Sequence, residues 1–255
     1  MRGKRIIITG ASSGIGYELL KQLRNDNKIF AVSRNIEKIE ESENVKAFSC
    51  DVSVAENVDR LFEEALVFLG RIDVFFANAG FAYYEKIENP DWKHNLKIFE
   101  TNVLSVLYSL QKLKEIKRGS EFTFIITASA MSYLAVPGYA LYASTKFALK
   151  GFADAYRHEL EKGQNLCLVY PVATLTEFFN TAHANEIPWP RQTADVVAKK
   201  IIKAVSRGKI NIYPCFIFSI GLILNKIFPI FKLYHFIEGK KYKRKIENNL
   251  NLSTI

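Results

Sequence analysis

A glycine-rich turn near the start of the chain limits its possible folds more than any other feature. Residues 9–16 read Thr-Gly-Ala-Ser-Ser-Gly-Ile-Gly, between the apolar run Ile6–Ile8 and a helical pattern. Bare backbone at Gly10, Gly14 and Gly16 permits a tight turn, close approach of a phosphate and close packing of helix on strand. The first N–H groups of the helix could hold a pyrophosphate. The alternative is a turn without a ligand, but the strand–turn–helix context favours nucleotide binding.

Apolar runs alternate with helical patterns along most of the chain. The runs are short, unalternating and rich in β-branched or aromatic residues, as in strands buried on both faces. They are Arg5–Thr9, Ile29–Ser33, Val45–Ser49, Ile72–Ala77, Phe122–Thr127 and Leu166–Tyr170, with helices expected at Val54–Leu69 and Ala140–Lys162. The pattern predicts an α/β fold: one domain with a doubly wound parallel sheet and an apolar C-terminal helical appendage. We expect the Rossmann-type domain to span residues 1–209 and the extension 210–247, followed by a disordered tail at 248–255.

A phenol and an ammonium group are spaced to meet on one helix face. Tyr142 and Lys146 are four residues apart, and Ser129 lies thirteen residues before Tyr142. A nearby ammonium favours the phenolate, so we expect Lys146 to lower the pKa of Tyr142 from about 10 toward neutrality. Such a phenol suits general acid–base catalysis. The alternative, an ordinary amphipathic helix with a surface ion, is disfavoured by the glycine turn. Tyr139 is a weaker candidate for the acid, because the residue four positions after it is alanine rather than lysine.

The end of the second expected strand bears on the nucleotide. Strands that hold NAD end in Asp or Glu, which binds the ribose hydroxyls. Here Ser33 is followed by Arg34, whose guanidinium suits a 2′-phosphate. We therefore expect NADP rather than NAD, although Arg34 could also be a solvated surface arginine.

Together these motifs resemble the short-chain dehydrogenase/reductase family in its compact form, over roughly residues 4 to 206. The 9–16 turn is similar to the family's Thr-Gly-x-x-x-Gly-x-Gly motif. The resemblance implies that Asp51 and Val52 contact adenine, that Asn78-Ala79-Gly80 shapes the cofactor floor, and that Pro171 and Thr176 border the nicotinamide. Val172 stands where the family usually has glycine. Cofactor contacts are thus expected from Gly10, Ser12, Ser13, Gly14, Ile15, Gly16, Arg34, Asp51, Val52, Asn78, Ala79, Gly80, Tyr142, Lys146, Pro171 and Thr176.

The resemblance also implies a catalytic tetrad of Asn102, Ser129, Tyr142 and Lys146. Tyr142 would protonate a carbonyl oxygen as hydride arrives, and Ser129 would hold that oxygen. Lys146 would bind the nicotinamide ribose, and Asn102 would hold a water that links Lys146 to solvent. The expected activity is that of an NADP-dependent oxidoreductase acting on a carbonyl or alcohol. The resemblance further implies a homodimer or tetramer formed through helices near 101–117 and 140–162.

Substrate contacts are less constrained by the sequence. Apolar side chains near the motifs could line a pocket, although such residues more often belong to the core. If they do line a cleft, the substrate is lipophilic or aromatic. The candidates are Ala130, Met131, Leu134, Val136, Phe178, Phe179 and Trp189.

The C-terminal segment combines apolar residues with lysines. The run 210–237 is strongly apolar, but Lys226 and Lys232 interrupt it, so it is too short to span a bilayer. One reading is a segment that lies at the surface of an anionic membrane. The other is a strand near Ile210–Tyr213 and a helix that packs on the chain's own cleft or on a partner subunit. A membrane-associated lipid-ketone reductase is therefore an alternative within the same activity.

The distribution of charge, cysteine and histidine argues against several other classes of protein. Of the net charge of +9, +6 comes from 226–245, and no nucleic-acid-binding motif is present, so we expect no nucleic-acid partner. Three separated cysteines and four scattered histidines (His94, His158, His183 and His235) suggest neither a metal site nor disulfides. We expect a cytoplasmic enzyme, with peripheral membrane contact as an option. A rival from another class is an NADP-binding sensor or scaffold without turnover, which would not need a tuned phenol.

Overall fold

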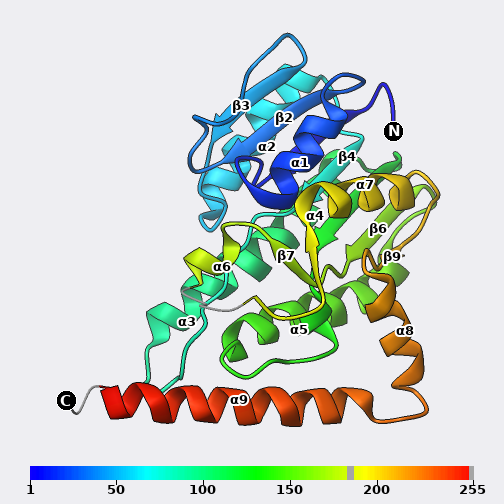
Figure 1. The fold of residues 1–255 in the computed structure, drawn as a ribbon. Helices are drawn as coiled ribbons and strands as arrows, with labels where there is room; N and C mark the ends of the chain where they lie inside the picture. Colours follow the sequence, from blue (N-terminus) through cyan, green and yellow to red (C-terminus); the bar gives the residue numbers. More distant parts are fainter. Residues whose placement is uncertain (183–186, 253–255) are drawn as a thin grey trace.

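The computed structural model describes residues 1–182 and 187–252, with side chains through Arg244. Its main element is a parallel sheet of seven strands in the order β3-β2-β1-β4-β5-β6-β9, with helices on both faces (Figure 1). The strands are β1 (Arg5–Thr9), β2 (Lys28–Ser33), β3 (Val45–Ser49), β4 (Val74–Ala77), β5 (Phe122–Thr127), β6 (Gln164–Val169) and β9 (Asn211–Ile212). A small second sheet pairs β7 (Ala173–Leu175) with β8 (Arg191–Thr193). The predicted fold class is confirmed.

The helices cover both faces of the sheet and bury its apolar strands. β4 is buried along its whole length, and two clusters of apolar side chains, one led by Phe75 and Phe124 and the other by Ile6 and Ile8, fill the two faces. The helices are α1 (Gly14–Leu23), α2 (Ala55–Leu69), α3 (Trp92–Phe99), α4 (Ser105–Ile116), α5 (Ala140–Tyr156), α6 (Phe178–Thr181), α7 (Ala194–Val205), α8 (Phe216–Leu224) and α9 (Ile230–Leu252).

The strand order reverses direction at β1, because β2 lies on one side of it and β4 on the other. In open parallel sheets, ligands bind at the carboxyl ends of the strands beside such a switch point. The glycine turn follows β1 at this edge, so the topology places the proposed nucleotide site where parallel sheets bind ligands.

Two predicted boundaries differ from the structure for reasons of backbone geometry. The helix expected over Ala140–Lys162 ends at Tyr156, because 157–159 form a 3-10 turn and Leu160 is extended. Gly163 follows with φ of 89°, which a helix cannot accommodate, so β6 begins at Gln164. The strands β2, β4 and β6 differ from the prediction by one or two residues at an end.

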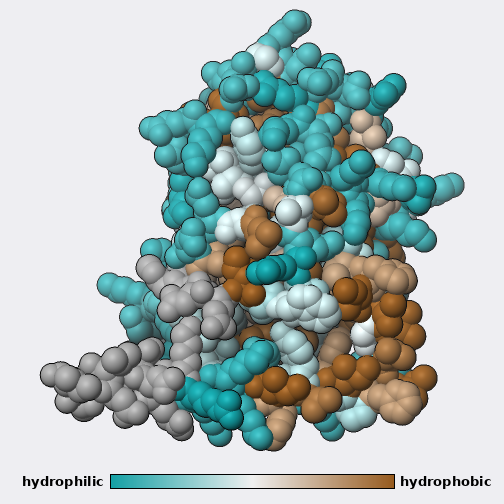
Figure 2. All heavy atoms as spheres, in the orientation of Figure 1, coloured by the Kyte–Doolittle hydropathy of each residue, from teal (hydrophilic) through white to brown (hydrophobic). Residues whose placement is uncertain are grey.

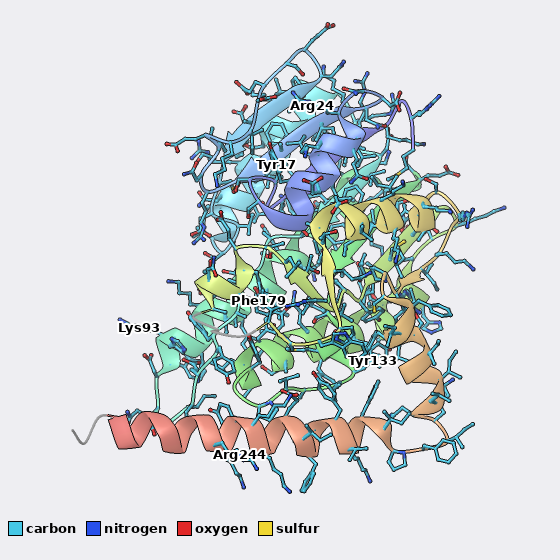
Figure 3. The ribbon with its side chains drawn as sticks, viewed as in Figure 1. Tyr17, Arg24, Lys93, Tyr133, Phe179 and Arg244 are labelled. Atoms are coloured by element: carbon cyan, nitrogen blue, oxygen red, sulfur yellow. The ribbon has the colours of Figure 1, made fainter. Side chains whose placement is uncertain are left out.

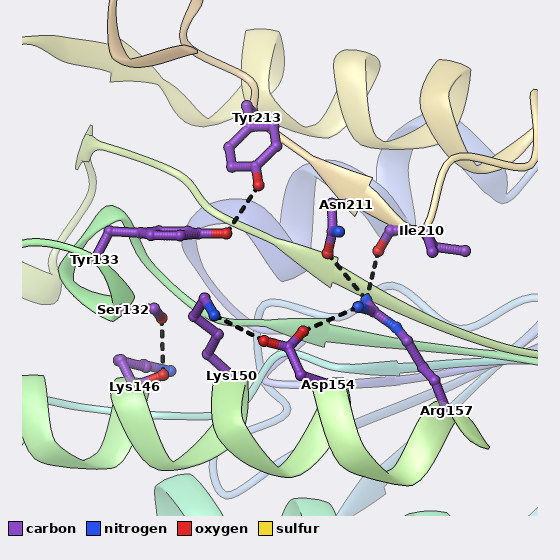
Figure 4. A network of polar contacts seen from close by, with 9 residues as sticks. All are labelled: Ser132, Tyr133, Lys146, Lys150, Asp154, Arg157, Ile210, Asn211 and Tyr213. Atoms are coloured by element: carbon purple, nitrogen blue, oxygen red, sulfur yellow. Dashed lines mark hydrogen bonds and ion pairs between the residues drawn. The ribbon is translucent and has the colours of Figure 1, made fainter. Parts of the chain in front are cut away.

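A polar network joins α5 to the start of the C-terminal extension (Figure 4). Asp154 pairs with Lys150 at 2.7 Å and with Arg157 at 3.3 Å. Arg157 Nη2 in turn donates to the Ile210 carbonyl and to Asn211 Oδ1, at 2.9 and 3.0 Å. These bonds hold β9 against β6 and fix where the extension leaves the domain.

The extension continues as two helices that return across the body of the protein (Figure 1). No described helix is both long enough and apolar enough to cross a membrane. The helix α9 continues to Leu252, and the disorder expected over 248–255 stays a prediction. Residues 253–255 lie outside the described part of the chain.

Candidate active site

The glycine turn has the geometry that its sequence predicts. Gly10 and Gly14 adopt φ of 68° and 55°, in the left-handed region where a side chain is strained. A Cβ on Gly16 would overlap the Gly10 carbonyl oxygen, so α1 can approach the turn only with glycine there. Ser13 is extended at the N-cap of α1 and makes no side-chain cap bond. Backbone N–H groups at the N-terminus of α1 therefore face the same edge as the turn.

Thr9 and Asn78 join the glycine turn to the next two strands. Thr9 Oγ1 accepts bonds from the Asn78 and Ala79 N–H groups at 3.0 and 3.1 Å. Asn78 Nδ2 donates to the Thr9 carbonyl at 3.2 Å, and its Oδ1 accepts from Thr127 Oγ1 at 3.1 Å. These contacts fix the 78–80 segment as one wall beside the turn.

Asn102 is fully buried in a π-helical stretch, Glu100–Leu104, at the start of the α4 region. Its Oδ1 accepts from the Phe81 N–H at 3.0 Å, and its Nδ2 donates to the Phe81 carbonyl and to Thr145 Oγ1, at 2.8 and 3.2 Å. The side chain is thus committed to protein partners. The water-holding role expected of Asn102 stays a prediction, and single π-helical turns of this kind are frequent at functional sites.

Ser129, Tyr142 and Lys146 come together at the carboxyl end of β5. All three are buried, with 8, 8 and 5 % of their surface exposed. Lys146 Nζ donates to the Thr127 carbonyl at 2.9 Å and lies 5.4 Å from the centre of the Tyr142 ring. The predicted clustering of phenol, hydroxyl and ammonium is present in the fold.

The prediction that the pKa of Tyr142 is lowered is wrong: the protein's own groups together raise it. Burial raises the pKa of Tyr142 to about 12, and a hydrogen bond with Ser129 lowers it only in part. Burial also lowers the pKa of Lys146 to about 8. Burial has the largest effect on both pKa values, because the same apolar surroundings disfavour the charged form of each group. They disfavour the phenolate of Tyr142 and the ammonium of Lys146. Tyr142 is therefore a protonated acid at neutral pH.

A cavity of about 420 Å³ runs from the glycine turn to Tyr142. Most of the expected cofactor residues line it: Gly10, Ser13, Gly14, Ile15, Arg34, Asn78, Ala79, Gly80, Tyr142, Lys146, Pro171 and Thr176. One cavity thus brings together the bare glycine turn and Tyr142, as binding of a dinucleotide requires.

Four expected cofactor residues do not line this cavity. Ser12 bonds Ser33 through their hydroxyls at 2.7 Å, Gly16 packs against the turn, and Val52 is buried. Asp51 instead borders a second hollow of about 250 Å³, together with Arg34, which borders both.

The hollow beside Asp51 has charges of both signs. Burial opposes ionisation of Asp51, but hydrogen bonds from the Ser53 N–H and hydroxyl, and then the Arg34 guanidinium, hold its pKa below the ordinary value. Arg60 from α2 also lines this hollow. Sequence reasoning missed Arg60, because a helix residue nine positions after Asp51 carries no local signal.

The apolar part of the cavity agrees with the candidates taken from the sequence. All seven line it: Ala130, Met131, Leu134, Val136, Phe178, Phe179 and Trp189. Figure 3 labels one of them, Phe179, which lies on α6.

Sequence reasoning missed two further parts of the lining. Tyr139, rejected as the acid, lines the cavity with a buried hydroxyl that has no hydrogen-bond partner among the described residues. The extension supplies Ile217, Phe218, Gly221, Ile230, Phe231 and Tyr234. Of the alternatives left open for this segment, packing on the chain's own cleft is therefore observed.

Metal ligation has no support in the described ranges 1–182 and 187–252, where no group of three or more His, Cys, Asp or Glu side chains could hold an ion. His183 lies outside the described residues. The three cysteines are buried thiols without disulfide bonds.

Comparison with known sequences agrees with this geometry. The family model described as short chain dehydrogenase matches residues 4–187. An uncharacterized oxidoreductase of Staphylococcus saprophyticus is 30% identical over 224 residues, covering 82% of this chain and 89% of that protein. The 3-ketodihydrosphingosine reductase of Bos taurus is 29% identical over 236 residues, covering 82% and 70% of the two chains.

Solved structures share the fold. A 3-ketoacyl-(acyl-carrier-protein) reductase from Brucella melitensis complexed with NADH is 25% identical, with a TM-score of 0.75 over 83% of this chain and 96% of that one. A short chain dehydrogenase from Burkholderia cenocepacia in complex with NADP superposes with a TM-score of 0.78 at 20% identity, covering 89% and 94%. With its glycine turn, its Ser129–Tyr142–Lys146 cluster and a family match over most of its length, the chain is an oxidoreductase that belongs to the short-chain dehydrogenase/reductase family.

Proposed function

We propose that this protein is an NADP-dependent reductase of a lipophilic ketone or aldehyde, able to catalyse the reverse oxidation of the alcohol. One observation carries the proposal: a single cavity is lined both by the glycine turn and by a buried, protonated Tyr142 beside Ser129 and Lys146. A nucleotide site and an acid thus share one space, as carbonyl reduction requires.

The reaction needs a proton for the carbonyl oxygen and a hydride for its carbon. A nicotinamide bound along the cavity would supply the hydride. Tyr142 Oη then gives its proton to the oxygen, and the Ser129 hydroxyl, which bonds the same phenol, holds that oxygen in line. Lys146, whose Nζ lies 5.4 Å from the centre of the Tyr142 ring, would stabilise by its charge the phenolate that remains until a proton returns from solvent. Developing charge would thereby be neutralised among buried side chains.

The preference for NADP rests on Arg34. It lines both the main cavity and the hollow beside Asp51, so one guanidinium is available where the adenosine ribose would lie. Arg60 adds a second guanidinium at the same hollow. Two cations favour the extra phosphate of NADP, while the carboxylate of Asp51 is held ionised and faces the same space.

A lipophilic substrate is supported by the apolar wall of the cavity. Its aromatic members, including Phe178, Phe218 and Phe231, would leave a polar substrate without partners over most of its length. The name of the bovine relative, 3-ketodihydrosphingosine reductase, describes a ketone on a long hydrocarbon chain and supports the same substrate class.

The expected homo-oligomer and cytoplasmic location remain proposals. Leu104, Ile116 and Phe147 are exposed apolar side chains on or beside α4 and α5, where the family resemblance places the subunit contact. Sedimentation of wild type and of Phe147→Glu would test this interface. If Phe147 lies at the subunit contact, the variant should sediment as a smaller particle.

The proposal is tested first by calorimetric titration with NADPH and with NADH. Wild type should bind NADPH more tightly, and Arg34→Ala should weaken NADPH by about tenfold or more while leaving NADH nearly unchanged. Arg24→Ala, which removes a cation paired with Glu40, is the matched control. A preference for NADH would reject the role of Arg34 and retain the enzyme.

The rival function, a sensor that binds NADP without turnover, is separated by a second assay. NADPH oxidation is followed with a panel of ketones and aldehydes of increasing chain length. Turnover that increases with chain length supports the proposal. Tight NADPH binding with no turnover across the panel would favour the sensor.

A further inference from the structure

The C-terminal helices present an apolar surface to solvent. Among the described residues, ten large apolar side chains between 216 and 237 are each at least 40 % exposed, up to 74 % at Phe216. We call this set the outer C-terminal face: Phe216, Ile217, Ile220, Ile223, Leu224, Ile227, Phe228, Leu233, Phe236 and Ile237. Figure 2 shows apolar side chains gathered over α8 and the start of α9. So many large apolar side chains exposed together on a folded protein mark an interaction site.

Basic residues flank the outer C-terminal face. Lys226 and Lys232 lie within it, and Lys240, Lys241, Lys243 and Arg244 follow it on α9, all exposed. Arg244 points away from the body of the protein (Figure 3). The nearby acid Glu238 is paired with Lys241 at 2.7 Å. The segment therefore combines apolar anchors with a surplus of positive charge, which matches a surface that is apolar below and negatively charged at its edge.

The opposite faces of the same helices line the proposed active-site cavity. Phe218 and Gly221 from α8, with Phe231 and Tyr234 from α9, belong to its lining. Ile217 lines the cavity and is also 51 % exposed, so the cavity meets the outer C-terminal face there. Trp189, 67 % exposed, lines the cavity as well.

The two helices are held firmly to the domain, so their exposed side chains do not belong to a loose tail. Phe218 stacks on Phe231 with ring centres 6.1 Å apart, and the Phe231 N–H donates to Asn225 Oδ1 at 2.8 Å. Tyr242, about halfway along α9, donates to the Glu85 carbonyl at 3.2 Å. At the other end, the Tyr213 hydroxyl bonds that of Tyr133 at 2.9 Å (Figure 4).

We propose that the outer C-terminal face docks on an anionic lipid bilayer and that a bilayer-resident lipid ketone enters the cavity beside Ile217. The substrate half of this inference rests on the function proposed above, whereas the docking half does not. In this arrangement the hydrocarbon chain of the substrate would stay among the apolar residues of α8 and α9 while its carbonyl reaches Tyr142.

A second copy of the chain fits this face less well than a bilayer does. A two-fold symmetric contact brings the same patch of both subunits together, which would enclose Lys226 and Lys232 of both copies in one apolar interface. Like charges at short range oppose such a contact, whereas anionic headgroups attract each lysine. The exposed apolar side chains would then enter the interfacial region without unfolding either helix.

Docking is tested by co-sedimentation of the full-length protein with phosphatidylcholine vesicles, with and without phosphatidylserine. Wild type should bind the vesicles that contain phosphatidylserine, and Phe228→Glu should weaken this binding by about tenfold or more. Phe228 is 61 % exposed and does not line the cavity, so the variant should fold and bind NADPH as wild type does. Val67→Glu, at a site 83 % exposed on α2, is the matched control and should bind vesicles normally.

Two results would overturn the docking proposal: no vesicle binding by wild type, or equal binding by Phe228→Glu. A concentration-dependent dimer that Phe228→Glu abolishes, seen without vesicle binding, would assign the face to a second copy.

Substrate entry is tested by comparing two ketones, a short water-soluble one and a long-chain one embedded in vesicles. Phe228→Glu should reduce the soluble ketone at the wild-type rate but lose most activity toward the embedded one. Equal activity of the variant on both would overturn entry from the bilayer. Vesicle binding without turnover of any ketone would reject the proposed function and leave docking intact, so the two failures are distinguishable.

Discussion

Lys146 directs its Nζ at the Thr127 carbonyl, 2.9 Å away, while lying 5.4 Å from the centre of the Tyr142 ring. The lysine is therefore tied to the end of β5 and sits beside the phenol without bonding its oxygen. The bond that reaches the phenol comes from Ser129. In this arrangement burial keeps Tyr142 protonated, because it raises the pKa of the phenol.

Replacing Tyr142 by phenylalanine should abolish turnover while leaving cofactor binding within a few-fold of wild type. The variant loses the proton donor but keeps the ring that packs against Phe178 at 5.4 Å. General acid catalysis contributes about 10²–10⁴-fold, so kcat should fall by about that factor. Single-turnover kinetics with NADPH and a reactive ketone would measure it. Unchanged turnover would remove Tyr142 from the mechanism.

Burial of Lys146 should make stability depend on pH in a known direction. Its pKa is lowered from 10.5 to about 8 in the folded protein, so between these values the unfolded chain binds more protons and stability rises with pH. Relative to Lys146→Met, the free energy of unfolding of wild type should increase by about 2 kcal/mol from pH 8 to pH 10.

Urea denaturation of both proteins at the two pH values checks this, because the other lysines cancel in the difference. Tyr142 acts in the opposite sense at higher pH, since its raised pKa of about 12 makes stability fall once the unfolded phenol ionises above about 10. A difference that is flat or falls between pH 8 and pH 10 would show that Lys146 is not desolvated.

Replacing each of two helical glycines by alanine should change the stability of the protein in opposite directions. A Cβ on Gly16 would meet the Gly10 carbonyl, so Gly16→Ala should push α1 from the turn, destabilise the protein by about 1–3 kcal/mol and weaken NADPH binding. Gly151 lies within α5, and a Cβ there would meet nothing within 4 Å. Gly151→Ala should stabilise the protein by about 1 kcal/mol, because alanine favours the helix. Thermal denaturation with and without NADPH separates the two effects.

Tyr139 and Tyr133 form a second matched pair. The Tyr139 hydroxyl is buried without a partner among the described residues, whereas the Tyr133 hydroxyl bonds that of Tyr213 at 2.9 Å. Tyr139→Phe should therefore stabilise the protein by about 1 kcal/mol, and Tyr133→Phe should destabilise it by a similar amount. Destabilisation by Tyr139→Phe would reveal a hydrogen bond of that hydroxyl in solution. A raised KM for ketones that carry a second polar group would show that the substrate uses it.

Most strands and helices could be predicted because each is marked by a pattern within its own few residues. The strands at Arg5–Thr9, Val45–Ser49 and Phe122–Thr127 have the predicted bounds, since each is a short apolar run between turn residues. The helix after Ala140 was predicted too long, because the 3-10 turn that ends it depends on where β6 must begin. The clustering of Ser129, Tyr142 and Lys146 followed from spacing and family resemblance, and the structure places them together.

Other properties of the site depend on segments distant in sequence. The expected lowering of the Tyr142 pKa failed because burial is a property of the assembled fold, which spacing along one helix does not report. The α8–α9 lining was missed for the same reason, because these helices reach the cavity from a segment more than seventy residues after Tyr142.

By itself, the amino-acid sequence determined the strand–helix alternation, the glycine turn and the pairing of Tyr142 with Lys146, because these depend on side-chain periodicity and backbone freedom over a few residues. Only the tertiary structure decided that the C-terminal extension returns to cover the cavity and exposes its other face. That outcome depends on contacts between residues more than a hundred positions apart, such as the bond between Tyr242 and Glu85, which no local pattern encodes.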